Sequence, residues 1–245
     1  MLRGRDVEWS RATAFPKSES PVTIEGFFRA IAALVHAMSV PLSSSADRDP
    51  LSADFWEGRY QNGTARWDLG KPAPALVDLL TSSDGPQPGR AVVLGSGSGH
   101  DAVLFAQHGF EVTGVDFAPA AIAAASQRAA NAQVAVDWLQ HNIFDLVPTY
   151  AQQFDYVVEH TCFCALEPNL REPYVQLVHQ LLKPGGQLIG VFFTHSRPGG
   201  PPFGSQPDEL RRLFGPHFEL RHLAVTPHSV RDRLGEEHLG LFDKR

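Results

Sequence analysis

The chain has 245 residues, of which 43% are apolar and 20% are charged, and these proportions suit one compact domain of ordinary size with an appendage. Its formal net charge is −6, from 21 Lys and Arg residues against 27 Asp and Glu residues. That sign is wrong for a broad phosphate-binding surface, so we expect no nucleic-acid partner. The best candidate for a membrane span, Val22 to Met38, is interrupted by Glu25 and Arg29, so we expect neither membrane insertion nor a signal peptide.

The 2 cysteines of the chain, Cys162 and Cys164, are separated by one residue. This spacing suits neither an ordinary disulfide nor a zinc knuckle, and the histidines are scattered without metal-ligand spacing. We therefore expect a reducing, cytoplasmic setting and no bound metal. Both cysteines are predicted to be small core residues and not reactive groups.

Residues 1–50 differ in character from the rest of the chain. Their acidic and basic residues balance, and two segments rich in Ser, Pro and Asp flank one predicted helix, Thr23–Met38. That helix could dock on the domain or on another subunit, but we favour an extension without a catalytic role. We predict a partly helical or disordered extension over residues 1–50, a single domain over residues 51–245, and a monomer or weak homo-oligomer.

From Ala91 onward, apolar runs alternate with Ala-, Leu- and Gln-rich helical segments, which predicts a parallel sheet with helices on both faces. The runs are Ala91–Leu94, Glu111–Val115, Val134–Leu139, Phe154–Val158 and Gln187–Phe193. Two later runs, Phe218–Val225 and Leu239–Phe242, have no long helix between them and indicate an antiparallel finish. The predicted fold class is therefore α/β, with a doubly wound, mostly parallel seven-stranded sheet and an antiparallel C-terminal strand.

A glycine-rich turn, Gly95-Ser96-Gly97-Ser98-Gly99-His100-Asp101, follows the first predicted strand and leads into a helical pattern, Ala102–His108. Such a turn lets a ligand approach the backbone N–H groups at the start of a helix closely, so it predicts a nucleotide-like ligand. The dinucleotide fingerprint needs a small residue where this chain has His100, and this disfavours NAD.

Two further features bear on the choice of cofactor. Asp116 ends the second predicted strand, where an acid can accept hydrogen bonds from both ribose hydroxyls in NAD proteins and S-adenosylmethionine proteins alike. The run from Leu181 to Leu188, a helix end followed by a Pro-Gly-Gly turn and a strand start, is typical of methyltransferases that use S-adenosylmethionine. Together these motifs predict such an enzyme, with a non-catalytic cofactor-binding protein and an NAD oxidoreductase as alternatives.

The sequence resembles the thiopurine S-methyltransferase family, in particular its branch of plant thiol and halide methyltransferases, over about Phe55 to Arg245. The blocks that carry the resemblance are Phe55–Tyr60 with Trp67-Asp68 and Gly70, then Gly99–Asp101, Glu159–Pro168 and Gly199–Phe203. The resemblance implies the class I S-adenosylmethionine-dependent methyltransferase fold with an N-terminal lid. It also implies S-adenosyl-L-methionine as cofactor and a small soft nucleophile as acceptor. A thiol is the leading acceptor, with halide, hydrosulfide, selenium or tellurium species, or another small molecule, as alternatives.

The same resemblance implies which residues contact the cofactor. They are the aromatic residues Trp56, Tyr60 and Trp67, the turn residues Gly95, Ser96 and Gly97, then Asp101, Asp116, Phe117, the Asn142-Ile143 pair beside the adenine, and His160. Two departures from the family pattern matter. Val93 stands where many methyltransferases carry an acid, so the methionine amino group needs another partner, for which Asp101 acting through water is a candidate. The thiopurine enzymes carry Arg where this chain has His160, which argues against drug-like purine thiols as acceptors.

Glu159 and His160 end the fourth predicted strand, where open parallel sheets place ligands, and they are the candidate catalytic residues. Methyl transfer from a sulfonium is an in-line displacement that requires neither a metal nor a covalent intermediate. His160 either takes a thiol proton, or positions the acceptor, or only hydrogen-bonds the cofactor. We expect the segment from Trp56 to Trp67 to close over the cofactor as a lid, and the loop from Arg197 to Gly204 to form a wall of the acceptor pocket.

Overall fold

The computed structural model describes residues 52–245, and the predicted extension with its helix lies outside the described residues. The helices are α2 (Ala53–Gln61), α3 (Pro74–Thr81), α4 (His100–Gln107), α5 (Pro119–Asn131), α6 (Arg171–Leu181) and α7 (Pro207–Phe214), with 3-10 helices η2 (Ile143–Asp145), η3 (Phe163–Ala165), η4 (Pro168–Leu170) and η5 (Arg231–Arg233). The strands are β1 (Arg90–Leu94), β2 (Glu111–Asp116), β3 (Asp137–Gln140), β4 (Phe154–His160), β5 (Leu182–Phe193), β6 (Phe218–Val225) and β7 (Glu237–Lys244).

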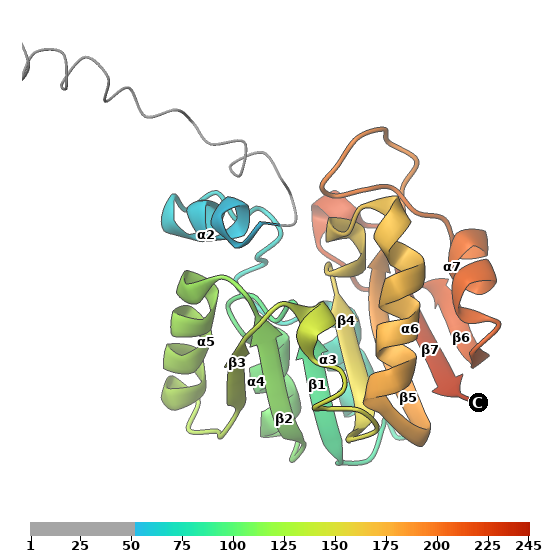
Figure 1. Cartoon of the computed structure of the whole chain (residues 1–245), viewed down its shortest axis with the longest axis horizontal. Helices are drawn as coiled ribbons and strands as arrows, with labels where there is room; N and C mark the ends of the chain where they lie inside the picture. Colours follow the sequence, from blue (N-terminus) through green and yellow to red (C-terminus); the bar gives the residue numbers. More distant parts are fainter. Residues whose placement is uncertain (1–51) are drawn as a thin grey trace, which may run out of the picture. The chain divides into compact units, whose positions relative to one another are not determined.

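The seven strands form one sheet in the order β3-β2-β1-β4-β5-β7-β6, shown in Figure 1. Neighbouring strands from β3 to β5 pair in parallel, whereas β7 runs antiparallel to both β5 and β6. The predicted fold class is therefore confirmed. The strand order reverses beside β1, so the loops that follow β1 and β4 run in opposite directions at the carboxyl edge of the sheet. Open α/β sheets bind ligands in the crevice between such loops.

Two predicted strands, β3 and β5, differ most from the structure at their beginnings. The prediction for β3 began at Val134, but the N–H of Val134 donates to the carbonyl of Ala129 in the closing turn of α5, so pairing with β2 begins only at Asp137. Strand β5 begins five residues earlier than predicted, at Leu182, which pairs with Phe154 before a bulge interrupts the register. A sequence pattern shows neither a helix-closing turn nor a bulge, because both depend on a partner segment.

Alternate residues of the parallel strands face opposite sides of the sheet, and each side has its own apolar core. Val92, Val157 and Leu188 face α6 and α7, which Figure 1 shows in front of the sheet. The adjacent residues, among them Val93 and Val158, face α3 and α4 behind it. Burial on both faces is the reason that these strands read as continuous apolar runs.

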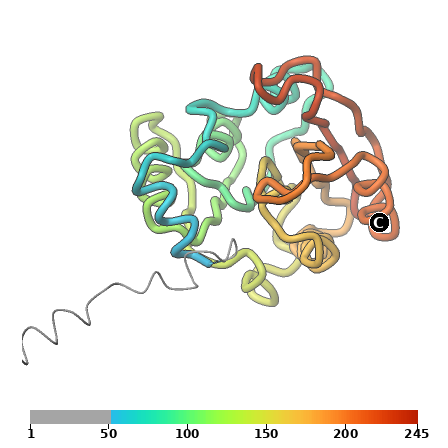
Figure 2. The backbone as a smooth tube through the Cα atoms, turned by 90° about the horizontal axis from the view of Figure 1, so that it is seen from above, coloured from blue at the N-terminus to red at the C-terminus, as the bar shows by residue number. Residues whose placement is uncertain are grey.

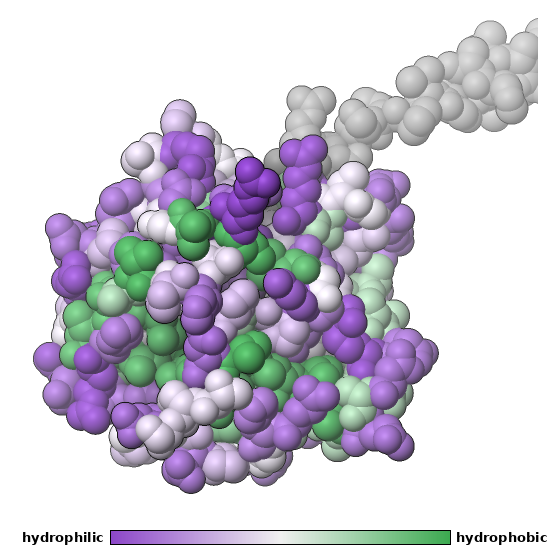
Figure 3. Space-filling view, turned by 180° about the vertical axis from the view of Figure 1, so that it is seen from behind, coloured by the Kyte–Doolittle hydropathy of each residue, from purple (hydrophilic) through white to green (hydrophobic). Residues whose placement is uncertain are grey.

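The surface of the described residues mixes apolar and polar side chains, and Figure 3 shows both kinds interspersed over the rear face. Within residues 52–245, the model has no helix with the length and apolarity that crossing a membrane requires. Cys162 and Cys164 are both buried and unpaired, which confirms the prediction that they are core residues. Burial raises the pKa of the Cys164 thiol to about 12 and also raises that of Cys162 well above its usual range, so neither forms a thiolate readily.

The front core contains an aromatic cluster centred on Phe192, whose ring lies 5.6 to 6.1 Å from the rings of Phe163, Phe214 and Phe242. We expect Phe192→Ala to lower the free energy of unfolding by about 3–5 kcal/mol, because it removes a ring that is 1% exposed and leaves a cavity. Urea titration followed by circular dichroism measures the change. Leu234→Ala is the control, since Leu234 is 63% exposed and its loss should cost less than about 0.5 kcal/mol. A loss below 1 kcal/mol for Phe192→Ala would contradict this packing.

Candidate active site

The glycine turn leaves β1 at the point where the strand order reverses. Gly95, Gly97 and Gly99 all have positive φ angles, of 60°, 52° and 81°, a backbone conformation that side chains disfavour. A Cβ atom on Gly99 would lie 2.7 Å from the Cβ of Ala125 and 2.8 Å from the ring of Trp138, so only glycine lets α4 begin so close to α5. The turn therefore presents bare backbone at the carboxyl edge of the sheet, as a nucleotide ligand requires.

Asp116, at the end of β2, supports this turn from below. One carboxylate oxygen accepts the N–H of Gly97 at 2.9 Å, and the other accepts the N–H of Ala118, also at 2.9 Å. The side chain is buried, and burial raises its pKa despite these hydrogen bonds. Each oxygen keeps a further acceptor position, so the predicted contact with a ribose is compatible with the bracing contact and stays a prediction.

The aromatic side chains that precede β1 converge, as their spacing predicts. The Trp67 ring lies 4.8 Å from Trp56 and 5.6 Å from Tyr60, and the indole N–H of Trp67 donates to the Tyr60 hydroxyl at 2.9 Å. Helix α2 lies beside α5, as Figure 2 shows from above, and the Glu57 carboxylate accepts the N–H of Ala120 at the start of that helix. The Tyr60 hydroxyl occupies the space above Gly97, where a Cβ atom would approach it to 2.9 Å.

A small cavity lies between this aromatic segment and the glycine turn, with a volume of about 40 Å³. Seven of the predicted cofactor residues line it, namely Tyr60, Trp67, Gly95, Ser96, Gly97, Asp101 and His160, whereas Trp56, Asp116, Phe117, Asn142, Ile143 and Glu159 do not. A nucleotide-sized ligand needs several hundred Å³. The aromatic segment therefore restricts the space above the glycine turn.

His160, the last residue of β4, joins both sides of the cavity. Its Nδ1 lies 2.7 Å from the Asp101 carboxylate, while its Nε2 lies 3.8 Å from Glu237 and 3.4 Å from the Arg233 guanidinium. Burial by itself lowers the pKa of His160, but the charge and hydrogen bond of Asp101, together with Glu237, outweigh it and raise the pKa to about 9. The imidazole is therefore protonated at neutral pH, and two cations face two carboxylates in one buried group.

Glu159, the other predicted catalytic residue, is fully buried below the cavity. One of its carboxylate oxygens accepts the backbone N–H groups of Cys162 and Phe163, at 3.0 and 3.1 Å, and so shapes the turn after β4. Its second oxygen has no hydrogen-bond partner in the described part of the chain, and burial raises the pKa of Glu159 to about 7. Glu159 contacts backbone here, and its catalytic assignment stays a prediction.

The predicted adenine neighbours also have contacts within the fold. The side-chain oxygen of Asn142 accepts the N–H of Phe144 at 3.0 Å and thereby caps η2, while Ile143 is 4% exposed and packs in the front core. Phe117 is half-buried after β2. These three residues follow the carboxyl ends of β2 and β3, the side of the crevice that the prediction gives to the adenine.

The residues 197–204 are fixed to the segment that follows β4. The N–H of Phe203 donates to the carbonyl of Cys164 at 2.6 Å, and the buried guanidinium of Arg171 donates to the carbonyls of Phe203 and Gly204. A loop held by three hydrogen bonds suits the predicted wall of an acceptor pocket better than a free turn does.

Sequence reasoning missed several polar residues of the site, among them Asp68, Ser98, Arg233 and Glu237. Asp68 lay inside a block that carries the family resemblance, and that signal could have found it. Arg233 and Glu237 had no such signal, because Arg233 is separated from His160 by 73 positions and reaches it only when β7 pairs with β5.

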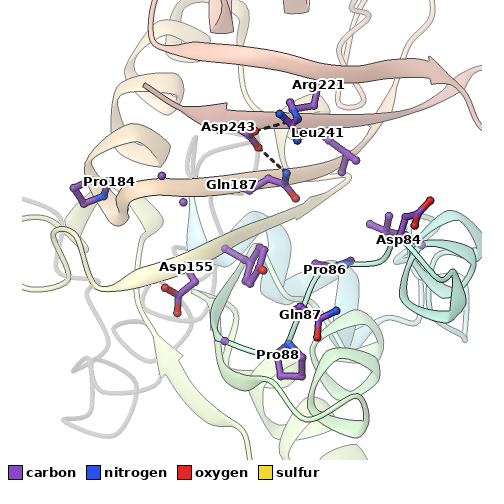
Figure 4. Close-up of a pocket in the computed structure, with 15 residues that line it drawn as sticks. Asp84, Pro86, Gln87, Pro88, Asp155, Pro184, Gln187, Arg221, Leu241 and Asp243 are labelled. Atoms are coloured by element: carbon purple, nitrogen blue, oxygen red, sulfur yellow. Dashed lines mark hydrogen bonds and ion pairs between the residues drawn. The ribbon is translucent and has the colours of Figure 1, made fainter.

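A larger and open hollow of about 620 Å³ lies at the amino ends of β1 and β4, away from the glycine turn, and is drawn in Figure 4. Three of its charged side chains are already paired: Asp243 with Arg221 and Gln187, as the dashed lines show, and Asp155 with Lys183. Within residues 52–245, no group of three or more His, Cys, Asp or Glu side chains is arranged to hold a metal ion. The small cavity at the carboxyl edge is therefore the candidate active site.

Comparison with known proteins finds a matching family and similar proteins. The family model for thiopurine S-methyltransferase matches residues 51–242. The chain is similar to a probable thiol methyltransferase 2 of Arabidopsis thaliana, at 34% identity over 79% of this chain and 86% of that protein. It is also similar to thiocyanate methyltransferase 1 of the same plant, at 31% identity over 77% of this chain and 84% of that one.

Among solved structures, the fold is similar to that of the 1,6-didemethyltoxoflavin-N1-methyltransferase of Burkholderia thailandensis, which was solved with bound S-adenosylhomocysteine. The TM-score is 0.65 at 20% sequence identity, over 84% of this chain and 92% of that one. At that level of identity the likeness establishes the fold alone.

The protonated His160 makes the stability of the domain depend on pH. Its pKa is about 9 in the folded chain against 6.5 in an unfolded one, so its stabilisation is complete below about pH 6.5 and is lost as the pH rises through about 9. We expect the wild type to lose up to about 3 kcal/mol over that window relative to His160→Gln. Urea titrations at several pH values measure this difference. His228→Gln, which removes an exposed histidine beside Asp78, should follow the wild type. Parallel curves for wild type and His160→Gln would contradict the assigned charge.

Proposed function

This chain belongs to the thiopurine S-methyltransferase family, and we propose that it methylates a small thiol or a related soft nucleophile such as halide, hydrosulfide, or a selenium or tellurium species. Family membership makes it an S-adenosylmethionine-dependent methyltransferase. The observation that carries the proposal is the meeting of the glycine turn and His160 in one cavity. The relatives named for thiol and thiocyanate acceptors support the same chemical class.

The residues present fit the cofactor. S-adenosylmethionine supplies an electrophilic methyl group on a sulfonium. The turn residues Gly95 to Gly97 offer bare backbone to its methionine end, and the Asp116 oxygens have acceptor capacity for the ribose. The faces of Trp56, Tyr60 and Trp67 suit a sulfonium, since a cation over an aromatic ring gains about 0.5–2 kcal/mol.

The aromatic segment acts as the lid in this proposal. The position of Tyr60 and Trp67 supports the assignment, because both line the cavity together with the glycine turn. Polar contacts tie this segment and the adjacent Asp68 to the rest of the domain, among them Glu57 to Ala120, Asp68 to Ser98 and His100, and the Trp67 carbonyl to Arg233. Closure over a bound cofactor would exclude the water that solvates a thiolate.

The charge of His160 supports one of the roles that the sequence leaves open. An imidazolium hydrogen-bonded to Asp101 has no free lone pair with which to take a thiol proton. We assign His160 to positioning the acceptor, with Arg233 as a second cation at the same place. A thiol acceptor then binds as its thiolate and its proton leaves to solvent, while iodide has no proton to lose.

The cellular setting and the assembly belong to the same proposal. Free, buried cysteines support a reducing compartment such as the cytoplasm. A small-molecule acceptor needs neither a nucleic-acid surface nor a second subunit, and a monomer or weak homo-oligomer stays our prediction.

The function is tested by supplying S-adenosylmethionine with a panel of thiols, hydrosulfide, halides, thiocyanate and selenite, and measuring S-adenosylhomocysteine and the methylated product together. We expect product with at least one thiol or soft anion, in equal amount to S-adenosylhomocysteine. Binding of the cofactor without turnover of any acceptor would indicate a non-catalytic protein. Turnover restricted to oxygen or nitrogen acceptors would overturn the acceptor class.

The role of His160 is tested by comparing a thiol with iodide. We expect His160→Gln to lower kcat/KM for both acceptors by a similar factor, about 10- to 100-fold, because one charge-assisted contact is lost in each case. Steady-state kinetics at pH 7 measure both losses, with His228→Gln as the control. A loss at least tenfold larger for the thiol than for iodide would show that His160 accepts the thiol proton.

A further inference from the structure

We propose that the carboxylate of Asp68 binds the α-amino group at the methionine end of the cofactor. The inference deepens the proposed function and rests on it, because it assigns a partner to one group of the cofactor. The α-amino group needs a partner in this chain, because Val93 stands where many methyltransferases carry an acid. Val93 is itself 3% exposed and offers no polar atom from its side chain.

Asp68 reaches the cavity from the aromatic segment and not from the sheet. It lines the same cavity as the glycine turn, and one of its oxygens accepts the Ser98 hydroxyl of that turn at 2.6 Å. The other oxygen accepts the N–H of Gly70 at 2.7 Å and lies 3.2 Å from Nε2 of His100. These contacts fix the carboxylate against the turn, and 24% of the side chain stays exposed.

The charge of Asp68 is available for a cation. The nearby imidazole of His100, with hydrogen bonds from Ser98 and Gly70, holds the pKa of this carboxyl well below its usual range, so it is ionised throughout the physiological range. In the part of the chain that the structure describes, no Lys or Arg forms an ion pair with it. A carboxylate has about four acceptor positions, so the contacts from Ser98, Gly70 and His100 leave room for one ammonium donor.

Asp101, the partner considered from the sequence, is less suited to this role. One of its oxygens accepts the N–H of Ala73 at 2.8 Å and the other pairs with the imidazolium of His160 at 2.7 Å. Its side chain is 13% exposed, about half as much as that of Asp68. The buried group that contains it, with Glu237, His160 and Arg233, already balances two negative charges with two positive ones. A second cation beside Asp101 would upset that balance.

The test uses the full-length protein and two ligands, S-adenosylhomocysteine and the analogue in which hydrogen replaces the α-amino group. Isothermal titration gives the four affinities of wild type and Asp68→Asn. We expect the substitution to weaken S-adenosylhomocysteine at least tenfold and the analogue less than threefold. Equal weakening of both ligands would overturn the proposal, because a residue that only braces the turn affects both.

Matched variants separate the charge from the fold. Asp101→Asn and Ser98→Ala should change the affinities for the two ligands by equal factors, whereas Asp68→Glu should keep the preference for the amino group. Asp155→Asn, at the opposite edge of the sheet, should change neither affinity. A ligand preference that disappears in Asp101→Asn and persists in Asp68→Asn would assign the amino group to Asp101 instead. Failure of wild type to bind S-adenosylhomocysteine would overturn the proposed function itself.

A measurement on the wild type keeps the proposal falsifiable even if Asp68→Asn does not fold. A nearby carboxylate favours the charged form of an amine, so bound S-adenosylhomocysteine should titrate at a higher pH than the free ligand. Carbon-13 NMR of ligand labelled at the α-carbon reports this midpoint. A midpoint equal to or below that of the free ligand would overturn the contact with Asp68.

Discussion

The hydrogen bond between His160 and Asp101 holds the two sides of the active-site crevice together. Asp101 lies in the first turn of α4, which follows the glycine turn, and His160 ends β4 on the other side of the reversal in strand order. With both groups charged and buried, the contact is stronger than a neutral hydrogen bond, and the loss of either partner would leave an unpaired charge. Glu237 and Arg233 are placed around this pair by β7 and the loop before it.

The buried group of Asp101, His160, Arg233 and Glu237 also contacts the aromatic segment. Arg233 contacts His160 and Glu237 with one guanidinium nitrogen and donates to the Trp67 carbonyl with another, at 3.1 Å. Asp68, the next residue, contacts the glycine turn. Polar contacts therefore hold the aromatic segment on two sides, and these contacts can exchange with water. Its rings also pack above the glycine turn. In the proposed mechanism, such contacts let the aromatic segment open for the cofactor without disturbing either apolar core.

Sequence reasoning found the local features of the site and missed the partners that come from far away. Asp116 and the glycine turn adjoin predicted strands, and their chemistry follows from that position alone. His160 was found as a strand-end residue, but its protonation was not, because the pKa depends on Asp101 and Glu237, which are 59 and 77 positions distant. Asp68 was visible as part of a motif, yet only the fold brings it against Ser98.

The sequence by itself determined the α/β class, the order of the strands along the chain, the family and the cofactor, because these follow from apolar periodicity and from motifs whose residues are neighbours in the chain. The tertiary structure decided what each polar side chain contacts. Charge state, burial and acceptor capacity arise from groups that meet only when β7 inserts between β5 and β6 and the aromatic segment folds back over β1. A sequence pattern does not show which groups come into contact in the folded chain, and the energy of a buried charge depends on those neighbours in space.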